Sequence, residues 1–288
     1  MLGIRSRDKQ LVIMAAAESN DSNKNNNPLF SICSASVLSG AVSIVFTVPQ
    51  VVALSAASAA PLPATPYLSG SMKGIFAKSI GMQTGLKVAH FGAVKILKDT
   101  FDAAPGGGFG AYNINVAYGL VAVPAQAASY NSLTADVFQY FGKSKPTATT
   151  SWAQASSDFF AKKIRPGFFW TFVRDSNSVG GGLLMGPVAA KFIAEQRSSC
   201  PDATPSRADK LIGGTLAGAV CGFATQIFHN AALTTGRAAE LGAPLSTMQC
   251  MTQLWTANGF ASFYKGFPNR VVVIASMSGI LNLTEPFK

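Results

Sequence analysis

Stretches without any charged side chain alternate along the chain with apolar stretches that carry a few bases. Three stretches contain no Asp, Glu, Lys or Arg: 31–60, 109–135 and 211–236. Each is longer than the ~20 residues that a helix needs to cross the hydrocarbon core of a bilayer. Three further apolar stretches follow basic residues: 75–97, 168–190 and 271–283. The pattern predicts six transmembrane helices, alternately uncharged and charge-bearing.

The bases in the charge-bearing apolar stretches indicate which side of each helix faces the interior. The stretch 75–97 contains Lys78, Lys87, His90 and Lys95. Charged groups inside a membrane span normally face a bundle interior or water. Five bases are predicted to line such an interior and to favour anions there: Lys78, Lys87, Lys95, Lys191 and Arg270. For bases near helix ends, the alternative is that their long side chains reach out to lipid head groups.

The composition agrees with a membrane protein. Of the 288 residues, 48% are hydrophobic and only 12% are charged, against roughly 25% charged in ordinary soluble domains. The formal net charge is +10, and 27 residues are glycine, which lets membrane helices approach closely. A large soluble domain rich in Ala and Gly is the alternative that composition leaves open.

No pattern of residues indicates an enzyme. The four cysteines have no paired spacing, so they predict neither a metal centre nor a disulfide framework, and they are interpreted as buried thiols. The sequence contains no nucleophile–base pair and no phosphate-binding loop. The bases are scattered through apolar stretches, which argues against nucleic-acid binding. We therefore expect a protein that is not an enzyme and has no catalytic residue, metal or cofactor.

Repeated motifs divide the chain into thirds. Residues 1–28 form a polar extension, and repeats are predicted over 29–104, 105–200 and 201–288 as parts of one domain. The motif Gly-Ala-Val occurs at Gly40 in the first third and at Gly218 in the last. Each third then contains a step to glycine beside a base: Lys73-Gly74, Pro166-Gly167 after Arg165, and Lys265-Gly266.

The block 258–267 resembles a known family signature. Its Asn258-Gly259, four residues and then Tyr264-Lys265-Gly266 are similar to the acidic-Gly-x4-aromatic-basic-Gly half of the mitochondrial carrier signature, with Asn258 in the acidic place. The resemblance covers about 32–288. It implies an all-α membrane protein with six transmembrane helices, arranged as three pseudo-symmetric helical hairpin repeats with short matrix-side helices. It also implies the mitochondrial inner membrane, with both termini towards the intermembrane space.

The same resemblance implies where gates should lie. In the family, each odd-numbered helix has a proline, an acid two residues later and a base three residues after that, and ion pairs between neighbouring helices close the matrix end. The corresponding positions here are Pro49, Val51 and Leu54; Pro124, Gln126 and Ser129; and Ile227, His229 and Ala232. All three acids and all three bases are replaced. At the opposite end, the pattern aromatic-acidic-x-x-basic leaves only Lys95, Lys191, Glu285 and Lys288.

Two sets of candidate binding residues follow. Arg174 and Asp175 fall where carriers contact substrate on the fourth helix, and Lys87 is added as a base inside the second; the alternative for Arg174 and Asp175 is a helix-packing ion pair. A base before glycine at a helix start offers free backbone amides to a phosphate, and in the family such steps bind cardiolipin. The candidate lipid residues are Lys73, Gly74, Tyr264, Lys265 and Gly266, with a plain helix cap as the alternative.

Two functions remain in competition at the level of sequence. The lost gate residues favour an accessory, structural subunit of a respiratory-chain or other inner-membrane complex, with cardiolipin and neighbouring subunits as partners. The alternative is an active carrier that transports a small anionic or amino-acid-type metabolite and closes through hydrogen bonds and apolar contacts.

Overall fold

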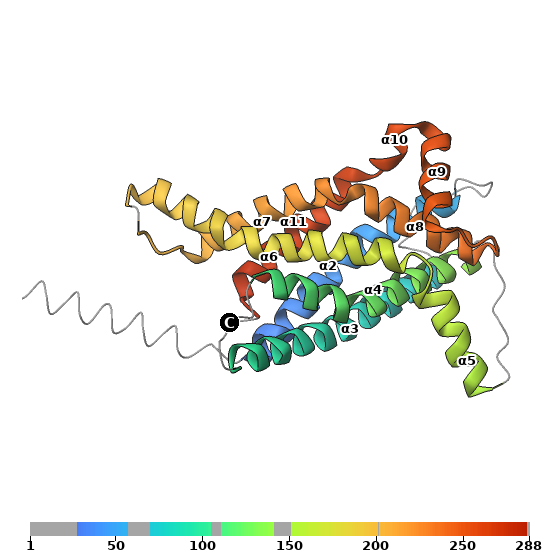
Figure 1. The fold of residues 1–288 in the computed structure, drawn as a ribbon, viewed down its shortest axis with the longest axis horizontal. Helices are drawn as coiled ribbons and strands as arrows, with labels where there is room; N and C mark the ends of the chain where they lie inside the picture. Colours follow the sequence, from blue (N-terminus) through green and yellow to red (C-terminus); the bar gives the residue numbers. More distant parts are fainter. Residues whose placement is uncertain (1–27, 57–69, 105–110, 141–150, 201, 287–288) are drawn as a thin grey trace, which may run out of the picture.

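The computed structural model describes residues 28–56, 70–104, 111–140, 151–200 and 202–286, which include every helix of Figure 1. Within these ranges the chain is helical and contains no strand, so the predicted all-α class is confirmed. The long helices are α2 (Pro28–Ala56), α3 (Gly70–Asp102), α4 (Ala111–Tyr140), α6 (Phe168–Ser198), α7 (Arg207–Ala224), α8 (Gln226–Glu240) and α11 (Phe267–Thr284). Short elements join them: α5 (Trp152–Phe159), the π-helical turn η1 (Phe160–Ile164), α9 (Thr247–Asn258) and α10 (Phe260–Phe263).

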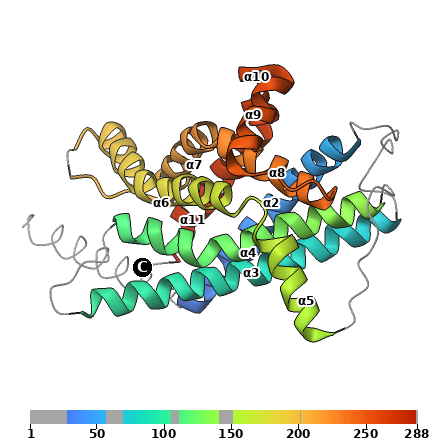
Figure 2. The same ribbon diagram turned by 45° about the vertical axis from the view of Figure 1, so that its right-hand side comes forward.

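The long helices pack in a cycle. In the described part of the chain, α2 contacts α3, α3 contacts α4, α4 contacts α6, α6 contacts α7, α7 contacts α11, and α11 returns to α2. Figures 1 and 2 show α3 and α4 side by side along one side of the molecule and α6 and α7 along the other. The short elements α5, α9 and α10 lie at one end, which we call the connector end, while α2 begins and α11 finishes at the other (Figure 1).

The six predicted apolar stretches fall on these long helices, apart from residues 57–60 and 109–110, which lie outside the described ranges together with the extension 1–27. By length and apolar composition, α2 qualifies as a membrane-spanning helix over Pro28–Val48. Among the described residues, only α7 and α8 taken together as one bent span give a second candidate. The finer expectation of six spans is therefore supported at one or two of the six positions.

The helix α2 buries polar as well as apolar residues. Its buried face carries Ser36, Ser39, Ser43 and Thr47, which recur every three to four residues, and it also carries apolar residues such as Ile44. Its exposed face carries Val37, Leu38 and Val45. An exposed apolar face opposite buried hydroxyl groups is typical of a helix that turns apolar side chains to lipid and polar ones to a central interior.

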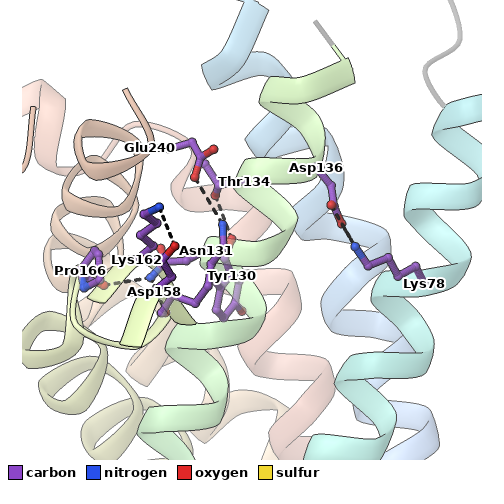
Figure 3. A network of polar contacts seen from close by, with 10 residues as sticks. Lys78, Tyr130, Asn131, Thr134, Asp136, Asp158, Lys162, Pro166 and Glu240 are labelled. Atoms are coloured by element: carbon purple, nitrogen blue, oxygen red, sulfur yellow. Dashed lines mark hydrogen bonds and ion pairs between the residues drawn. The ribbon is translucent and has the colours of Figure 1, made fainter. Parts of the chain in front are cut away.

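Two of the three hairpin connections share one local structure (Figure 3 shows the first). Gly167 precedes α6 and Gly266 precedes α11, and both have left-handed backbone, with φ of 71° and 75°. The Asn131 amide donates to the carbonyl of Pro166 at 3.0 Å, and the Asn230 amide donates to that of Lys265 at 3.1 Å. Each asparagine comes 35 residues before its acceptor. The second and the third repeat thus share the same connection, in which an asparagine side chain binds the carbonyl just before the left-handed glycine.

The shared connection changes how the third repeat aligns with the second. Pro124 lies seven residues before Asn131. The residue seven positions before Asn230 is Phe223, so Phe223 is the structural equivalent of Pro124. The sequence comparison placed Ile227 there, which is one helical turn too late. The chain bends between α7 and α8 by 57°, and Thr225 caps this break by donating its hydroxyl to the Cys221 carbonyl at 2.7 Å. A threonine that bonds back to its own helix often bends it, so the bend here needs no proline.

The first third departs from the predicted motif. Gly74 was predicted to precede a helix, but α3 begins at Gly70, so Lys73 and Gly74 lie within its first turns. The described left-handed glycines do not include Gly74. The prediction of a helix-start site at Lys73-Gly74 is therefore wrong, because the helix extends four residues further back. The connection 57–69 itself lies outside the described ranges.

Glycines allow α7 to pack closely against α11. A Cβ atom on Gly214 would lie 2.6 Å from the Ser278 carbonyl oxygen, and one on Gly218 would lie 2.5 Å from that of Ile274. In both cases the obstacle is the backbone of α11, which cannot rotate away. By contrast, a Cβ on Gly81 in α3 would meet nothing within 4 Å.

We expect Gly214→Ala to destabilise the protein by about 1–3 kcal/mol, because α7 and α11 must move apart. Gly81→Ala is the matched control and should stabilise it by ~1 kcal/mol, since alanine is the better helix former. Thermal unfolding of both variants in detergent measures the difference. Equal effects of the two substitutions would contradict the packing described here.

We expect Asn230→Ala to cost about 2 kcal/mol, because the Asn230 amide also donates to the Ser262 and Phe263 carbonyls, and the substitution removes this donor from both. The exposed Asn258 at the end of α9 provides the control: Asn258→Ala should change stability by less than ~0.5 kcal/mol. Thermal unfolding measures both, and a harmless Asn230→Ala would show that this connection does not depend on its asparagine.

Candidate functional site

Charged side chains from three helices meet inside the ring. Lys87 of α3, Arg174 and Asp175 of α6, and Arg270 of α11 are 0%, 1%, 4% and 3% exposed. Lys87 interacts electrostatically with each of the other three. We call these four residues the basic cluster. It contains three cations and one carboxylate, which leaves two positive charges without a negative partner within the cluster.

Arg174 and Asp175 form a two-pronged ion pair although they are neighbours in sequence. Arg174 Nε donates to Asp175 Oδ1 at 2.6 Å, and Nη2 donates to Oδ2 at 2.8 Å. Both side chains are almost fully buried, so the pair is screened little by water. The carboxylate of Asp175 therefore accepts two hydrogen bonds from Arg174 within the same helix.

Arg174 is held on two further sides. Its guanidinium carbon lies 4.7 Å from the centre of the Tyr130 ring of α4. Its Nη1 lies 3.4 Å from Nδ1 of His229 of α8. The Tyr130 and His229 rings stand edge to face with centres 6.3 Å apart, and the Tyr130 hydroxyl lies 3.4 Å from Ser43 Oγ of α2.

Lys87 and Arg270 differ from Arg174 in their surroundings. The described residues offer Lys87 Nζ no hydrogen-bond partner, and its closest aromatic contact is the Phe91 ring, with 5.8 Å from Nζ to the ring centre. Arg270 donates from Nη2 to Ser178 Oγ at 3.2 Å. Burying a charge without a partner costs several kcal/mol, an amount that a bound counter-ion can offset. The cluster can therefore accept an anion, and two negative charges would neutralise it.

The five bases predicted to line an interior divide into two groups. Lys87 and Arg270 belong to the basic cluster. The other three are corrections to that prediction, because each pairs with an acid outside the cluster: Lys78 with Asp136 at 2.7 Å, Lys95 with Asp99 at 2.6 Å and Lys191 with Glu195 at 3.6 Å. The pair of Lys78 and Asp136 joins α3 to α4 near the connector end (Figure 3).

The predicted gate positions at the connector end are filled by neutral contacts. Val51 packs in an apolar cluster with Ile44, Val48, Leu133 and Val137. Gln126 and Ser129 are buried, and Ser129 accepts a hydrogen bond from Gln83.

The third-repeat gate positions lie close by. His229 meets Arg174, while Ile227 and Ala232 pack against the cluster around Trp170. Pro49 and Leu54 lie in α2, and nothing is described of their side chains.

At the opposite end, the predicted gate bases do not pair across helices. Lys95 and Lys191 each pair with an acid one turn further along their own helix. Glu285 pairs with Lys210 at 2.9 Å and so joins α11 to α7. Lys288 lies outside the described residues.

The candidate lipid residues lie at the connector end. Gly266 has the left-handed conformation that opens α11, and Lys265 beside it is exposed. The Tyr264 ring packs against Phe223 and Phe260, with ring centres 5.2 Å apart in each case. An exposed base, an aromatic patch and a helix start therefore meet at one place, which is a suitable arrangement for a phosphate head group.

Sequence reasoning missed Tyr130 and Ser43. No signal marks Tyr130, because Tyr112 and Tyr118 precede it in the same uncharged stretch. The three-to-four-residue spacing of Ser36, Ser39, Ser43 and Thr47 was readable as one helix face, and it points to the interior that Tyr130 also enters.

The cysteines are all free thiols. Cys221 and Cys250 are buried as predicted, whereas Cys200 is exposed and Cys33 is intermediate, so the prediction of buried thiols is wrong for Cys200. Burial raises the pKa of the Cys250 thiol, which also lies 3.3 Å from the Ala231 carbonyl. Among the described residues no group of three His, Cys, Asp or Glu side chains is placed to hold a metal ion.

Two cavities lie away from the basic cluster. One of about 410 Å³ lies between α6, α7 and α11, beside Lys210 and Glu285. Another of about 250 Å³ is lined by α8, α9 and the loop between them.

Comparisons with protein-family models, curated proteins and solved structures found no match to this chain. The resemblance of block 258–267 therefore rests on the residues of this chain alone.

We expect Asp175→Asn to destabilise the protein by about 3–5 kcal/mol, because it leaves three buried cations without a carboxylate. Asp136→Asn removes the carboxylate of a largely exposed pair and should cost at most ~1 kcal/mol. Chemical denaturation of the two variants makes the comparison. A mild effect of Asp175→Asn would mean that the basic cluster is hydrated and open.

Proposed function

We propose that this chain is a carrier-type membrane protein that binds a small anionic solute inside its ring of helices. The observation that carries the proposal is the basic cluster, in which Lys87, Arg174 and Arg270 share one carboxylate, that of Asp175. A protein interior that keeps two excess cations is stable when an anion joins them. A dianion, such as a dicarboxylate or a phosphate, matches this charge.

The proposed place of action is the mitochondrial inner membrane, with both ends of the chain towards the intermembrane space. The exposed apolar face of α2 and the hydroxyl groups on its buried face support a membrane location. The carrier-like block 258–267 and the two repeated connections before Gly167 and Gly266 support the carrier type. Cardiolipin is the proposed bound lipid at Tyr264, Lys265 and Gly266, where the exposed Lys265 lies beside the aromatic patch of Tyr264, Phe223 and Phe260.

The residues of the cluster have distinct proposed roles. Lys87 and Arg270 bind the solute directly, because both are buried cations beside an Asp175 carboxylate whose hydrogen bonds come from Arg174. Arg174 contributes a third positive charge, which Asp175 orients when no solute is bound. Solute entering from either end would replace the hydration of its anionic groups with these side chains.

An accessory subunit of a larger inner-membrane complex is the second candidate function. It is favoured by the neutral residues at Val51, Gln126, Ser129, His229 and Ala232, which take the places of the charged gate residues of carriers. A protein fixed within an assembly has no need to alternate between two open states. Anion binding and an accessory role are compatible, so binding and transport need separate tests.

We expect millimolar succinate or phosphate to raise the unfolding temperature of the purified protein, since a ligand that binds only the folded state stabilises it. Lys87→Met should abolish this shift and raise the unfolding temperature without anion, because it removes a buried, unpaired cation. Lys191→Met, which removes a 60% exposed lysine, is the control and should leave the anion effect intact. An identical shift in wild type and Lys87→Met would exclude the proposed site.

Two further measurements separate the candidate functions. Saturable exchange of a labelled dicarboxylate by the protein in liposomes supports transport. Comigration with a much larger complex on native gels, without exchange, supports the accessory subunit.

A further inference from the structure

We propose that Tyr130 closes the ring at its connector end by joining α2, α4 and α8 through neutral contacts, and that it positions Arg174 at the anion site. The inference rests on the proposed function, because it assigns the closing contact of the same site. It replaces the ion pairs that the sequence lacks with one aromatic residue. We call Tyr130, Ser43, His229 and Arg174 the tyrosine hub.

The hub brings together α2, α4 and α8, which belong to the first, second and last thirds of the chain. Ser43 comes from α2, Tyr130 from α4 and His229 from α8, and both partners approach Tyr130 directly. The helix contacts agree, since α4 packs against both α2 and α8. Arg174 enters from α6 and lies against the Tyr130 ring, so the side chain that closes the three helices also touches the cluster that binds the anion.

Its contacts have the strength that a breakable closure requires. A buried cation over a tyrosine ring, an edge-to-face ring pair and one long hydroxyl contact each contribute little, and together they are comparable to a few surface ion pairs. Four side chains at 8% exposure or less make the hub a dry contact. Such a contact closes a path to water without a charge pair.

An apolar segment continues the closure beyond the hub. Leu133 and Val137 follow Tyr130 at three and seven residues and therefore lie on the same face of α4. They pack with Ile44, Val48 and Val51 of α2. Tyr130 is thus the innermost member of a row of contacts that runs from the anion site to the connector end.

The position of Arg174 couples binding to closure. Its guanidinium is shared among Asp175, the Tyr130 ring and His229. A solute that draws this guanidinium towards Lys87 and Arg270 removes the cation from the Tyr130 ring. Binding therefore weakens the contact that holds the three helices together, which is the coupling that a carrier needs.

The test uses the full chain in lipid nanodiscs and measures two quantities. One is the succinate affinity, from the dependence of the unfolding temperature on concentration. The other is the hydrogen-exchange rate of residues 126–134 and 226–233. The variants are Tyr130→Leu, Tyr130→Phe, His229→Leu and the control Tyr140→Leu. The control makes the same substitution ten residues further along α4, where Tyr140 packs at the edge of the apolar cluster and not in the hub.

We expect Tyr130→Leu to accelerate exchange in both segments about tenfold and to weaken succinate binding by a similar factor. Tyr130→Phe keeps the ring and should stay within about threefold of wild type for both quantities. His229→Leu should accelerate exchange mainly in 226–233. In wild type, a tenfold rise in salt should leave the exchange rate unchanged, since a buried neutral contact is screened less than exposed ion pairs.

Three results would overturn the hub. They are wild-type exchange rates in Tyr130→Leu, equal acceleration in Tyr140→Leu and Tyr130→Leu, and exchange that rises with salt. Should Tyr130→Leu fail to fold, unchanged exchange in His229→Leu would overturn it as well. If wild type shows no response to succinate or phosphate, the proposed function fails, while the exchange comparison still decides whether Tyr130 closes the ring.

Discussion

The buried pair of Arg174 and Asp175 is the interaction on which the interior of this protein depends. Three cations cannot share a dry interior, because each repels the others and none is solvated. Asp175 neutralises one of them by accepting two hydrogen bonds from its neighbour in sequence. Lys87 and Arg270 leave the cluster with a formal net positive charge, which is why an anion is the proposed solute. The chemistry of the site follows from this charge imbalance, whichever solute meets it.

Much of the architecture was predictable from the pattern of apolar stretches and from a few glycines. The uncharged stretches became α2, α4 and the pair α7 and α8, and Gly266 opens α11 with a left-handed backbone. The prediction that Lys73-Gly74 precedes a helix was wrong. Its sequence is like that of Lys265-Gly266, but it lies inside α3. A two-residue motif cannot show how far back a helix extends, because the preceding residues decide that. The register of the last third went wrong for a related reason: Thr225 bends the helix where a proline was sought.

The site itself was only partly readable. Lys87, Arg174 and Asp175 stood out because charges in apolar stretches are expensive and therefore informative. Tyr130 and Ser43 did not stand out, because each is an ordinary residue for its stretch. Their contacts join residues that are far apart in the sequence. Ser43 lies 87 positions before Tyr130, and Arg174 lies 55 positions before His229. Local periodicity places such residues on an inward face but does not tell which of them touch.

The packing is uneven around the ring, and this bears on how it can move. Gly214 and Gly218 bring α7 against the backbone of α11 with no room for a methyl group, whereas Gly74, Gly81, Gly85 and Gly92 of α3 have open space where a side chain would go. A close-packed interface resists sliding. The open space lies along α3, although α2 meets α3 closely at Gly40, where a Cβ would lie 3.2 Å from the backbone nitrogen of Thr84. Lys87 comes from α3 and Arg270 from α11, so the basic cluster joins the loosely packed and the tightly packed parts of the ring. Under the proposed function, an anion bound at the cluster would link these two parts, and its release would leave two cations close together.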